Sequence, residues 1–266
     1  MRAVGLAAPF AATGEKVIDM VAGSGRLALF LGRFLRELPP GIRYHRLFLE
    51  QCIQIGMASM PLVVFTSLFV GGVAALQSAY QFRGYIPLVY VGTVISKSVF
   101  IELGPVLTAL VVGGRVGAAL AAEIGTMRVT EQIDALETLA IRPVRYLVVP
   151  RVTAAFFMLP MLTVFANTIA ILGGMLVAVN RIGLSTVTFN RGMKLLFDVD
   201  DIYGGLLKSF AFGAIIALSG CYFGFQTTGG AEGVGEATKK AVVASCVLIL
   251  VTDYFLAEVI FRLLFG

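Results

Sequence analysis

Five long apolar stretches divide this chain, and they constrain its fold more than any other feature. They cover about residues 52–79, 86–122, 147–179, 204–226 and 240–264. A bilayer core about 30 Å thick is crossed by roughly 20 mainly apolar helical residues, since a helix rises about 1.5 Å per residue. The second stretch is too long for one straight span, and we expect an interruption at Gly104-Pro105. We therefore predict an all-α integral membrane protein with five transmembrane helices.

The amino-acid composition also indicates a protein that is embedded in a lipid bilayer. Hydrophobic residues make up 58% and charged residues 14% of the 266 positions, and the mean hydropathy is +0.90. Soluble domains carry roughly a quarter charged residues, and a soluble fold must wet its surface. We expect a single five-span membrane domain over residues 47–266.

Residues 1–46 form a separate N-terminal region in this interpretation. Short apolar runs alternate there with charges, and no apolar core followed by a small-residue cleavage site is present, so we do not expect a cleaved signal. The alternation over 16–38 is typical of an amphipathic helix lying in the membrane interface. Pro39-Pro40 is expected to end that helix.

The positions of Lys and Arg predict the orientation. One side of the membrane holds only Arg83, Arg181, Arg191 and Lys194. The other side holds Arg2, Lys16, Arg26, Arg33, Arg36, Arg43, Arg46, Arg115, Arg128, Arg142, Arg145, Arg151, Lys239 and Lys240. Because positive loops stay in the cytoplasm, we expect a cytoplasmic N-terminus, and five spans then put the C-terminus outside.

Small residues recur at helix-packing spacing. Gly113 and Gly117 form one GxxxG pattern, and Gly220 and Gly224 form another. Such faces let helix backbones approach closely where lipid provides no hydrophobic drive for association. They serve either packing within the chain or a subunit interface.

Three charged residues fall inside apolar spans: Glu102, Lys208 and Asp253. Each costs about 2.5–3.5 kcal/mol at a helix centre, so we expect them to face one another or a polar cavity. Either an ion-pair cluster locks the bundle, or the three charges line or gate a polar path. Lys97 lies nearer a span end, where its long side chain can reach the interface.

The loop between the second and third spans contains a short amphipathic helix, predicted at about 128–140. Val129, Ile133, Leu136 and Ala140 form one apolar stripe, and Pro143 terminates the segment. The opposite face carries Arg128, Glu131, Asp134 and Glu137. This helix either docks into a groove on a partner or lies on the membrane surface.

The sequence lacks the motifs of several classes of enzyme and nucleotide-binding protein. The chain has no GxxxxGK[ST] loop for ATP, no HExxH and no GxSxG, and His45 is its sole histidine. The glycine-rich loop 229–235 lacks a preceding strand, so it does not predict a phosphate site. We expect no catalytic residue, no metal site, no cofactor and no nucleic-acid partner, and therefore a chain that is not an enzyme.

The second stretch and its loop resemble the MlaE family, the permeases of bacterial MCE-type phospholipid transporters. The similarity lies in residues 102–110 (ELGPVLTAL), 114–128 (GRVGAALAAEIGTMR), 130–136 (TEQIDAL) and 147–151 (LVVPR). Further similar positions are Leu76-Gln77, Leu207-Lys208-Ser209 and Asp253. One departure is Ile101, where some relatives have Arg before the Glu.

The resemblance implies an ABC transporter of the bacterial inner membrane. It implies a homodimer of permeases, two cytoplasmic ATPase subunits that bind ATP and Mg²⁺, an outer MCE-domain lipid-binding protein and, in some systems, a STAS-domain regulator. The loop helix would then be the coupling helix, with Arg128, Glu131, Gln132, Ile133, Asp134, Leu136 and Glu137 at the ATPase contact. The lipid cavity would lie between the two permeases and be lined by Leu68, Val70, Val73, Leu76 and Gln77.

Two other function classes compete with a lipid permease. A proton-driven secondary transporter or channel would use Glu102 and Asp253 as a relay, although no repeated halves are visible. An intramembrane lipid enzyme would use either carboxylate as an acid or base, yet no nucleophile–base pair or metal cluster accompanies them. Transport by a permease coupled to a separate ATPase is the function that we expect.

Overall fold

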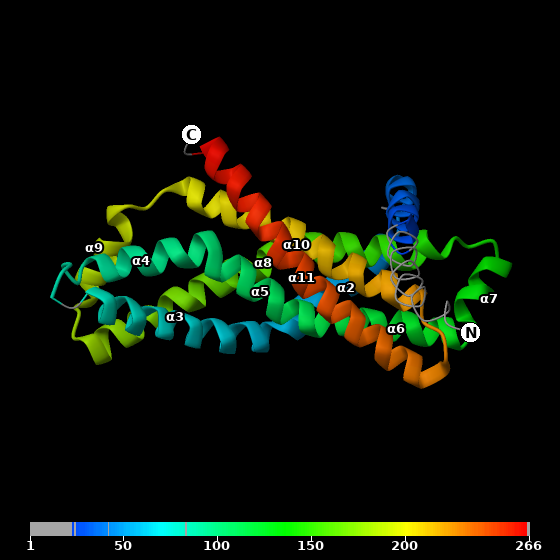
Figure 1. Ribbon diagram of the computed structural model, residues 1–266, viewed down its shortest axis with the longest axis horizontal. Helices are drawn as coiled ribbons and strands as arrows, with labels where there is room; N and C mark the ends of the chain where they lie inside the picture. Colours follow the sequence, from blue (N-terminus) through cyan, green and yellow to red (C-terminus); the bar gives the residue numbers. More distant parts are fainter. Residues whose placement is uncertain (1–22, 24, 42, 83, 265–266) are drawn as a thin grey trace, which may run out of the picture.

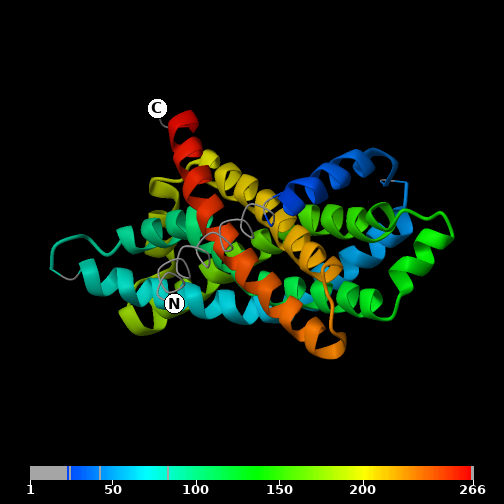
Figure 2. The same cartoon turned by 45° about the vertical axis from the view of Figure 1, so that its right-hand side comes forward.

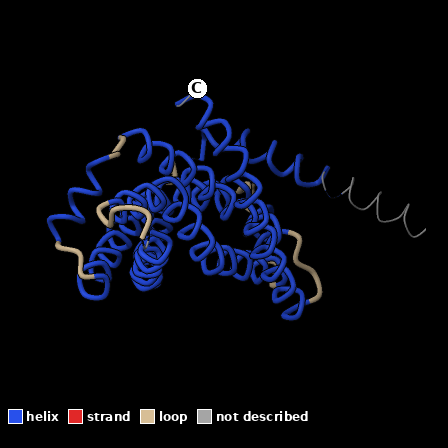
Figure 3. The backbone as a smooth tube through the Cα atoms, turned by 60° about the vertical axis from the view of Figure 1, so that its left-hand side comes forward, coloured by secondary structure: helices blue, strands red, loops and turns tan. Residues whose placement is uncertain are grey.

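The computed structural model describes residues 23, 25–41, 43–82 and 84–264. In these residues the chain forms helices joined by short loops, without a strand (Figure 3). Five helical stretches are long and apolar enough to cross a membrane. The predicted all-α membrane fold with five spans is therefore confirmed. The stretches are His45–Phe82, Tyr90–Val129, Val144–Ile182, Val199–Phe225 and Gly230–Arg262.

Several spans combine α-helix with tighter or wider turns. The first consists of α2 (His45–Gly56), a 3₁₀ turn (Met57–Ser59) and α3 (Met60–Phe82). The second consists of α4 (Tyr90–Ser98), a π-turn (Val99–Leu103), α5 (Gly104–Val112), a second π-turn (Gly113–Gly117) and α6 (Ala118–Val129). The third consists of a π-turn (Val144–Val148), α8 (Val149–Val177) and a π-turn (Ala178–Ile182). The others are α10 (Val199–Phe225) and α11 (Gly230–Leu264), with α7 (Gln132–Thr138) and α9 (Thr186–Leu195) between spans.

The sequence led us to expect an interruption of the second span at Gly104-Pro105. The structure shows a continuous helix there instead. The helix continues through this point because the π-turn Val99–Leu103 ends two residues before Pro105. Proline has no N–H to donate, and a locally wider turn accommodates that missing hydrogen bond without ending the helix. The span instead runs on to Val129, beyond the predicted end at residue 122.

Close approach between helices holds the bundle together. The backbone of α8 at Ala170 lies where a side chain on Gly71 of α3 would stand, and Leu68 of α3 lies likewise against Gly173. Gly220 of α10 lies against Gly117 and Leu120, and Gly224 lies against Ile124. The GxxxG glycines at 220 and 224 thus serve packing within the chain, which is one of the two roles that we considered.

The last helix lies at the edge of the bundle. Figure 1 shows α11 crossing obliquely over α5, α6 and α10. Its outer face carries exposed apolar side chains, among them Val243, Val247, Tyr254 and Phe255. An apolar face of this kind is expected where lipid or another protein covers a membrane helix.

The N-terminal helix, residues 25–41, lies at the α7 end of the bundle (Figure 2). Phe30 packs edge-on against Tyr222 with ring centroids 5.6 Å apart, and Phe34 is buried. The helix is described as far as Gly41, one residue past Pro40, so Pro39-Pro40 lies in its last described turn. The predicted portion before residue 23 lies outside the described residues.

Helix α9 was not anticipated. It begins after Ser185, whose side chain accepts a hydrogen bond from the Thr188 backbone N–H at 3.1 Å and so caps the helix. Phe189 is fully buried, and the Thr93 hydroxyl of α4 donates to the Gly192 carbonyl at 2.6 Å. These contacts fasten α9 across the end of α4.

Candidate functional site

The three intramembrane charges meet in one cluster. The Lys208 ammonium lies 2.5 Å from a Glu102 carboxylate oxygen and 3.0 Å from one of Asp253. The Lys208 side chain is only 2% exposed, whereas that of Glu102 is 39% exposed and that of Asp253 is 19% exposed. One ammonium thus lies between two carboxylates from two other spans, an arrangement that offsets much of the desolvation of the buried lysine.

A second ion pair joins two of these three spans, the second and the fourth. Lys97 of α4 is 3.0 Å from Asp201 of α10, and the Asp201 side chain is 3% exposed. Sequence reasoning placed Lys97 near the interface without a partner and did not consider Asp201. A usable signal was present, because Asp201 and Lys208 are seven residues apart and therefore share one face of α10.

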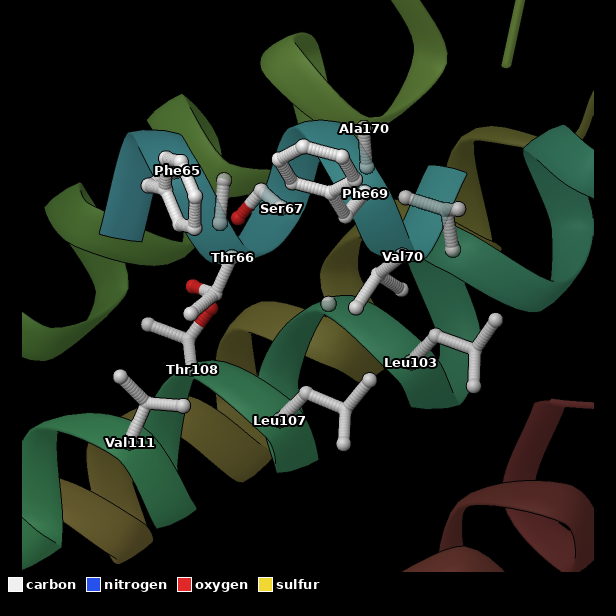
Figure 4. A pocket seen from close by; sticks show the side chains of 13 residues that line it. Phe65, Thr66, Ser67, Phe69, Val70, Leu103, Leu107, Thr108, Val111 and Ala170 are labelled. Atoms are coloured by element: carbon white, nitrogen blue, oxygen red, sulfur yellow. The ribbon is translucent and has the colours of Figure 1, made fainter. Parts of the chain in front are cut away.

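An apolar groove of about 350 Å³ lies between α3, α5 and α8. Figure 4 shows Phe65, Thr66 and Phe69 on the α3 side, and Leu103, Leu107, Thr108 and Val111 on the side of α5. The Thr66 hydroxyl donates to the Leu62 carbonyl at 2.8 Å, so this side chain adds little free polarity to the groove. The groove therefore suits a hydrocarbon chain better than a polar solute.

The groove and the charge cluster share one turn of helix. Val99 and Leu103, the first and last residues of a π-turn, line the groove. Glu102 of the same turn reaches Lys208 of α10. A displacement of this turn would therefore change the ion pair and the groove wall together. π-turns within helices are frequent at functional sites.

Only one of the five predicted cavity residues lines the groove. Val70 lines the groove. Leu68, Val73, Leu76 and Gln77 are exposed along α3 and are not among the groove-lining residues. Their place in a cavity shared by two chains stays a prediction, while Phe65, Thr66, Phe69 and the α5 residues are lining positions that sequence reasoning missed.

The loop helix is shorter than predicted and is turned inward. Helix α7 covers Gln132–Thr138, while Arg128 and Val129 still belong to α6. Glu131 and Ala140 have positive φ angles of 60° and 58°, so the backbone turns sharply at both ends. The prediction that residues 128–140 form one helix with a single apolar face is therefore wrong.

Within α7 the apolar and polar sides are clearly separated. Ile133 is 2% exposed in the main core, and Leu136 packs against the same core. Glu131, Gln132, Asp134 and Glu137 are exposed, and Asp134 pairs with Arg128 at 2.5 Å. The side of α7 available to a partner is therefore polar and acidic.

The N-terminal helix is fastened to the segment that follows α7. Arg142 and Arg145 hold the Glu37 carboxylate at 2.5 Å and 2.7 Å. The hydrogen bond from Arg142, together with Arg145, lowers the pKa of Glu37 below its ordinary value, although partial burial opposes this. Sequence reasoning missed this site, because the partners are about a hundred residues apart.

Comparison with known proteins identifies the family. The family described as "Permease MlaE" matches residues 48–259, which is most of the chain. The chain belongs to the MlaE permease family. Its five spans make it a multi-pass membrane protein of that family.

Relatives of similar length extend this assignment. A probable ABC transporter permease protein of Synechocystis is 43% identical over 236 residues, covering 88% of this chain and 90% of the relative. A probable ABC transporter permease protein of Rickettsia bellii is 39% identical over 249 residues, covering 94% and 96%. The intermembrane phospholipid transport system permease protein MlaE of Haemophilus influenzae is 32% identical over 251 residues, covering 94% and 96%. All three relatives are described as transporter permeases.

Proposed function

We propose that this MlaE-family chain is the membrane permease of an ABC-type phospholipid transporter in the bacterial inner membrane. The observation that carries the proposal is the apolar groove between α3 and α5, with a volume of about 350 Å³. The name of the Haemophilus relative, a phospholipid transport permease, agrees with a lipid substrate.

The groove has properties suited to transport rather than storage. Burying a methylene from water contributes about 0.8 kcal/mol. A lipid that arrives from the bilayer has already left water, and lipid tails are as apolar as leucine, so entering an apolar groove changes the free energy little. An acyl chain therefore enters and leaves such a groove without a deep energy well, and the direction must come from an energy source elsewhere.

That source is a separate cytoplasmic ATPase in this proposal. Two permease copies associate, each with its ATPase, and ATP and Mg²⁺ bind to the ATPase. An MCE-domain lipid-binding protein stands on the opposite side, and some such systems include a STAS-domain regulator. The relatives' description as ABC permeases supports the ATPase partner.

Helix α7 is the proposed coupling element. Its polar side, Glu131, Gln132, Asp134 and Glu137, is free to contact the ATPase. Ile133 and Leu136 anchor the other side in the core, so a force on α7 is transmitted to the bundle. The N-terminus and α7 lie in the cytoplasm in this orientation, and the C-terminus lies outside, because the arginine-rich ends of the spans gather with α7.

A proton-driven transporter is the second candidate. The exposed fraction of Glu102, 39%, favours it, because a relay carboxylate must be reached by a proton donor. Lys208 opposes it, since its ammonium holds both carboxylates in ion pairs.

The test is a reconstitution in proteoliposomes. The tagged chain is purified in mild detergent, and its partners and bound lipids are identified by mass spectrometry. We expect an ATPase, an MCE protein and phospholipid, and lipid transfer that stops without ATP. Transfer driven by a pH gradient in the absence of any ATPase would contradict the proposal.

A charge reversal on α7 tests the coupling. We expect Glu131→Lys with Glu137→Lys to reduce the lipid transfer per ATP hydrolysed, while the chain still inserts. Glu232→Lys, an exposed acidic residue at the start of α11, is the matched control and should leave this ratio unchanged. Equal coupling in both variants would count against α7 as the contact.

A further inference from the structure

Arg115 lies inside the second candidate span, Tyr90–Val129, and not at its end. Sequence reasoning counted it among the cytoplasmic charges, but it belongs to the second π-turn, Gly113–Gly117. It precedes the end of its span at Val129 by 14 residues, which is about 21 Å of helix. Gly113 lies against Ile216, and Gly117 lies against Gly220, so Arg115 is level with an apolar part of α10.

Arg115 differs in its partners from three other cations that lie within the spans. Lys97, Arg151 and Lys208 each have a carboxylate within 4 Å. Among the described residues, Arg115 has none. One of its terminal nitrogens donates to the Ser59 hydroxyl at 2.8 Å and to the Gln54 carbonyl at 3.4 Å. A guanidinium has five N–H donors, so most of its hydrogen-bonding capacity is not used by these contacts.

A second cavity of about 170 Å³ adjoins this guanidinium, between α2 and α6, and both polar and apolar side chains line it. Gln51 lines it, and the Gln51 side-chain oxygen is buried without a hydrogen-bond partner in the described part of the chain. Glu123 also lines the cavity, but Arg151 binds its carboxylate at 2.5 Å. Glu123 follows Arg115 by eight residues, about 12 Å along the helix, so its negative charge does not neutralise Arg115 directly.

This cavity continues the line of the apolar groove. Val111 lines the groove and Arg115 lines the second cavity, and the two residues are four apart, about one helical turn. Thr66 and Ala58 stand in the corresponding positions on the first span. A molecule with a hydrocarbon tail in the groove therefore meets a cation about one turn farther toward the α7 end.

We propose that Arg115 binds the phosphodiester of a phospholipid whose acyl chain occupies the α3–α5 groove. This inference rests on the proposed function and adds the recognition of the head group. The planar guanidinium matches a phosphate with paired hydrogen bonds, and such a charge-assisted contact is strong where water is scarce. An anion at this site would also supply the missing countercharge of an arginine that lies inside the membrane.

The chain contains no tryptophan, which gives a direct assay. In the full-length chain carrying Phe65→Trp, a single tryptophan replaces an aromatic side chain that already lines the groove, so the groove keeps most of its volume. The probes are dibrominated phosphatidylglycerol and dibrominated diacylglycerol, which has the same tails without phosphate. Quenching is measured in detergent micelles. We expect Arg115→Gln to weaken phosphatidylglycerol binding by about tenfold or more, as for a lost charged hydrogen bond, and to leave diacylglycerol binding unchanged.

Three further variants distinguish a role of Arg115 in phospholipid binding from a purely structural role. Arg115→Lys keeps the charge and should retain most of the preference for phosphatidylglycerol. Ser59→Ala removes the observed hydrogen bond but not the cation, and it should also retain the preference. Arg181→Gln, in the π-turn Ala178–Ile182 that follows α8, is the matched control and should behave as the chain that keeps both arginines. If Arg115→Gln does not fold, loss of the preference in Ser59→Ala would show that Arg115 acts only as a brace.

The outcomes distinguish the two proposals. Equal affinity for phosphatidylglycerol with and without Arg115 overturns the head-group site but leaves the groove intact. Absence of quenching by either lipid in the tryptophan-containing chain that keeps Arg115 would contradict the groove itself as a lipid site, and the proposed function with it. Displacement of the brominated lipid by millimolar inorganic phosphate would identify a site for free phosphate instead of lipid.

Discussion

Removing the Lys208 ammonium should destabilise the bundle strongly. Lys208→Met keeps most of the side-chain volume but leaves the carboxylates of Glu102 and Asp253 without their cation, 2.5 Å and 3.0 Å from the vacated position. Removing one partner of a buried ion pair costs about 3–5 kcal/mol. Because Glu102 is 39% exposed and retains some solvation, we expect the lower end, about 3 kcal/mol.

The corresponding shift is measurable by thermal denaturation in detergent. One kcal/mol lowers the melting temperature by about 2–4 °C in chains of this size, so Lys208→Met should melt about 6–12 °C below the parent chain. The triple variant Lys208→Met, Glu102→Gln, Asp253→Asn has no unpaired charge. It should recover most of the loss, because replacing a whole buried ion cluster by neutral groups is often nearly neutral in stability.

Two results would refute this reasoning. A melting temperature of Lys208→Met within 2 °C of the parent chain would mean that solvent already screens the cluster. A triple variant as unstable as the single one would mean that the three residues do not form one network. Lipid transfer by the triple variant then separates two roles: a cluster that only locks the bundle predicts restored transfer, and a gate predicts a stable chain without transfer.

Three other perturbations give independent checks. Ile133→Ala with Leu136→Ala should lower stability, by about 2–5 kcal/mol for the buried isoleucine alone, which thermal denaturation detects; an unchanged melting temperature would show that α7 does not pack on the core. Lowering the pH should destabilise the parent chain more than Glu37→Gln, because the lowered pKa of Glu37 means that its ion pairs stabilise the fold above the unfolded pKa of about 4.3 and are lost as pH falls through the folded value; melting curves between about pH 6 and pH 3 that run parallel would contradict this. Val70→Trp should fill the groove and reduce bound lipid in the purified protein, whereas Val164→Trp on the exposed side of α8 should not; equal lipid content in both would place the lipid elsewhere.

Much of the fold was predictable because lipid imposes a simple rule on sequence. Spans must be long, apolar and helical, so five were visible without any tertiary information. Their ends were less certain, because the helices extend past the apolar windows. The first span begins at His45, and the second ends at Val129.

The site was only partly predictable. Glu102, Lys208 and Asp253 were each conspicuous as charges in apolar surroundings, and the expense of such charges predicted that they would meet. Arg115 and Asp201 were as informative in principle, but sequence reasoning counted Arg115 among the cytoplasmic charges and did not consider Asp201. The inward side of α7 was misjudged because an amphipathic pattern does not say which partner covers its apolar face.

The sequence by itself determined the class of fold, the number of spans, the family and the identity of the costly charges. All of these depend on local composition and spacing, which the bilayer constrains directly. Only the tertiary structure decided which charges pair, where the groove lies and that Arg115 has no carboxylate partner in the described part of the chain. Such contacts join residues far apart in the chain, such as Lys208 and Glu102, which are separated by 106 positions. They depend on how helices cross and on glycines that allow close approach, and neither is set by any single segment.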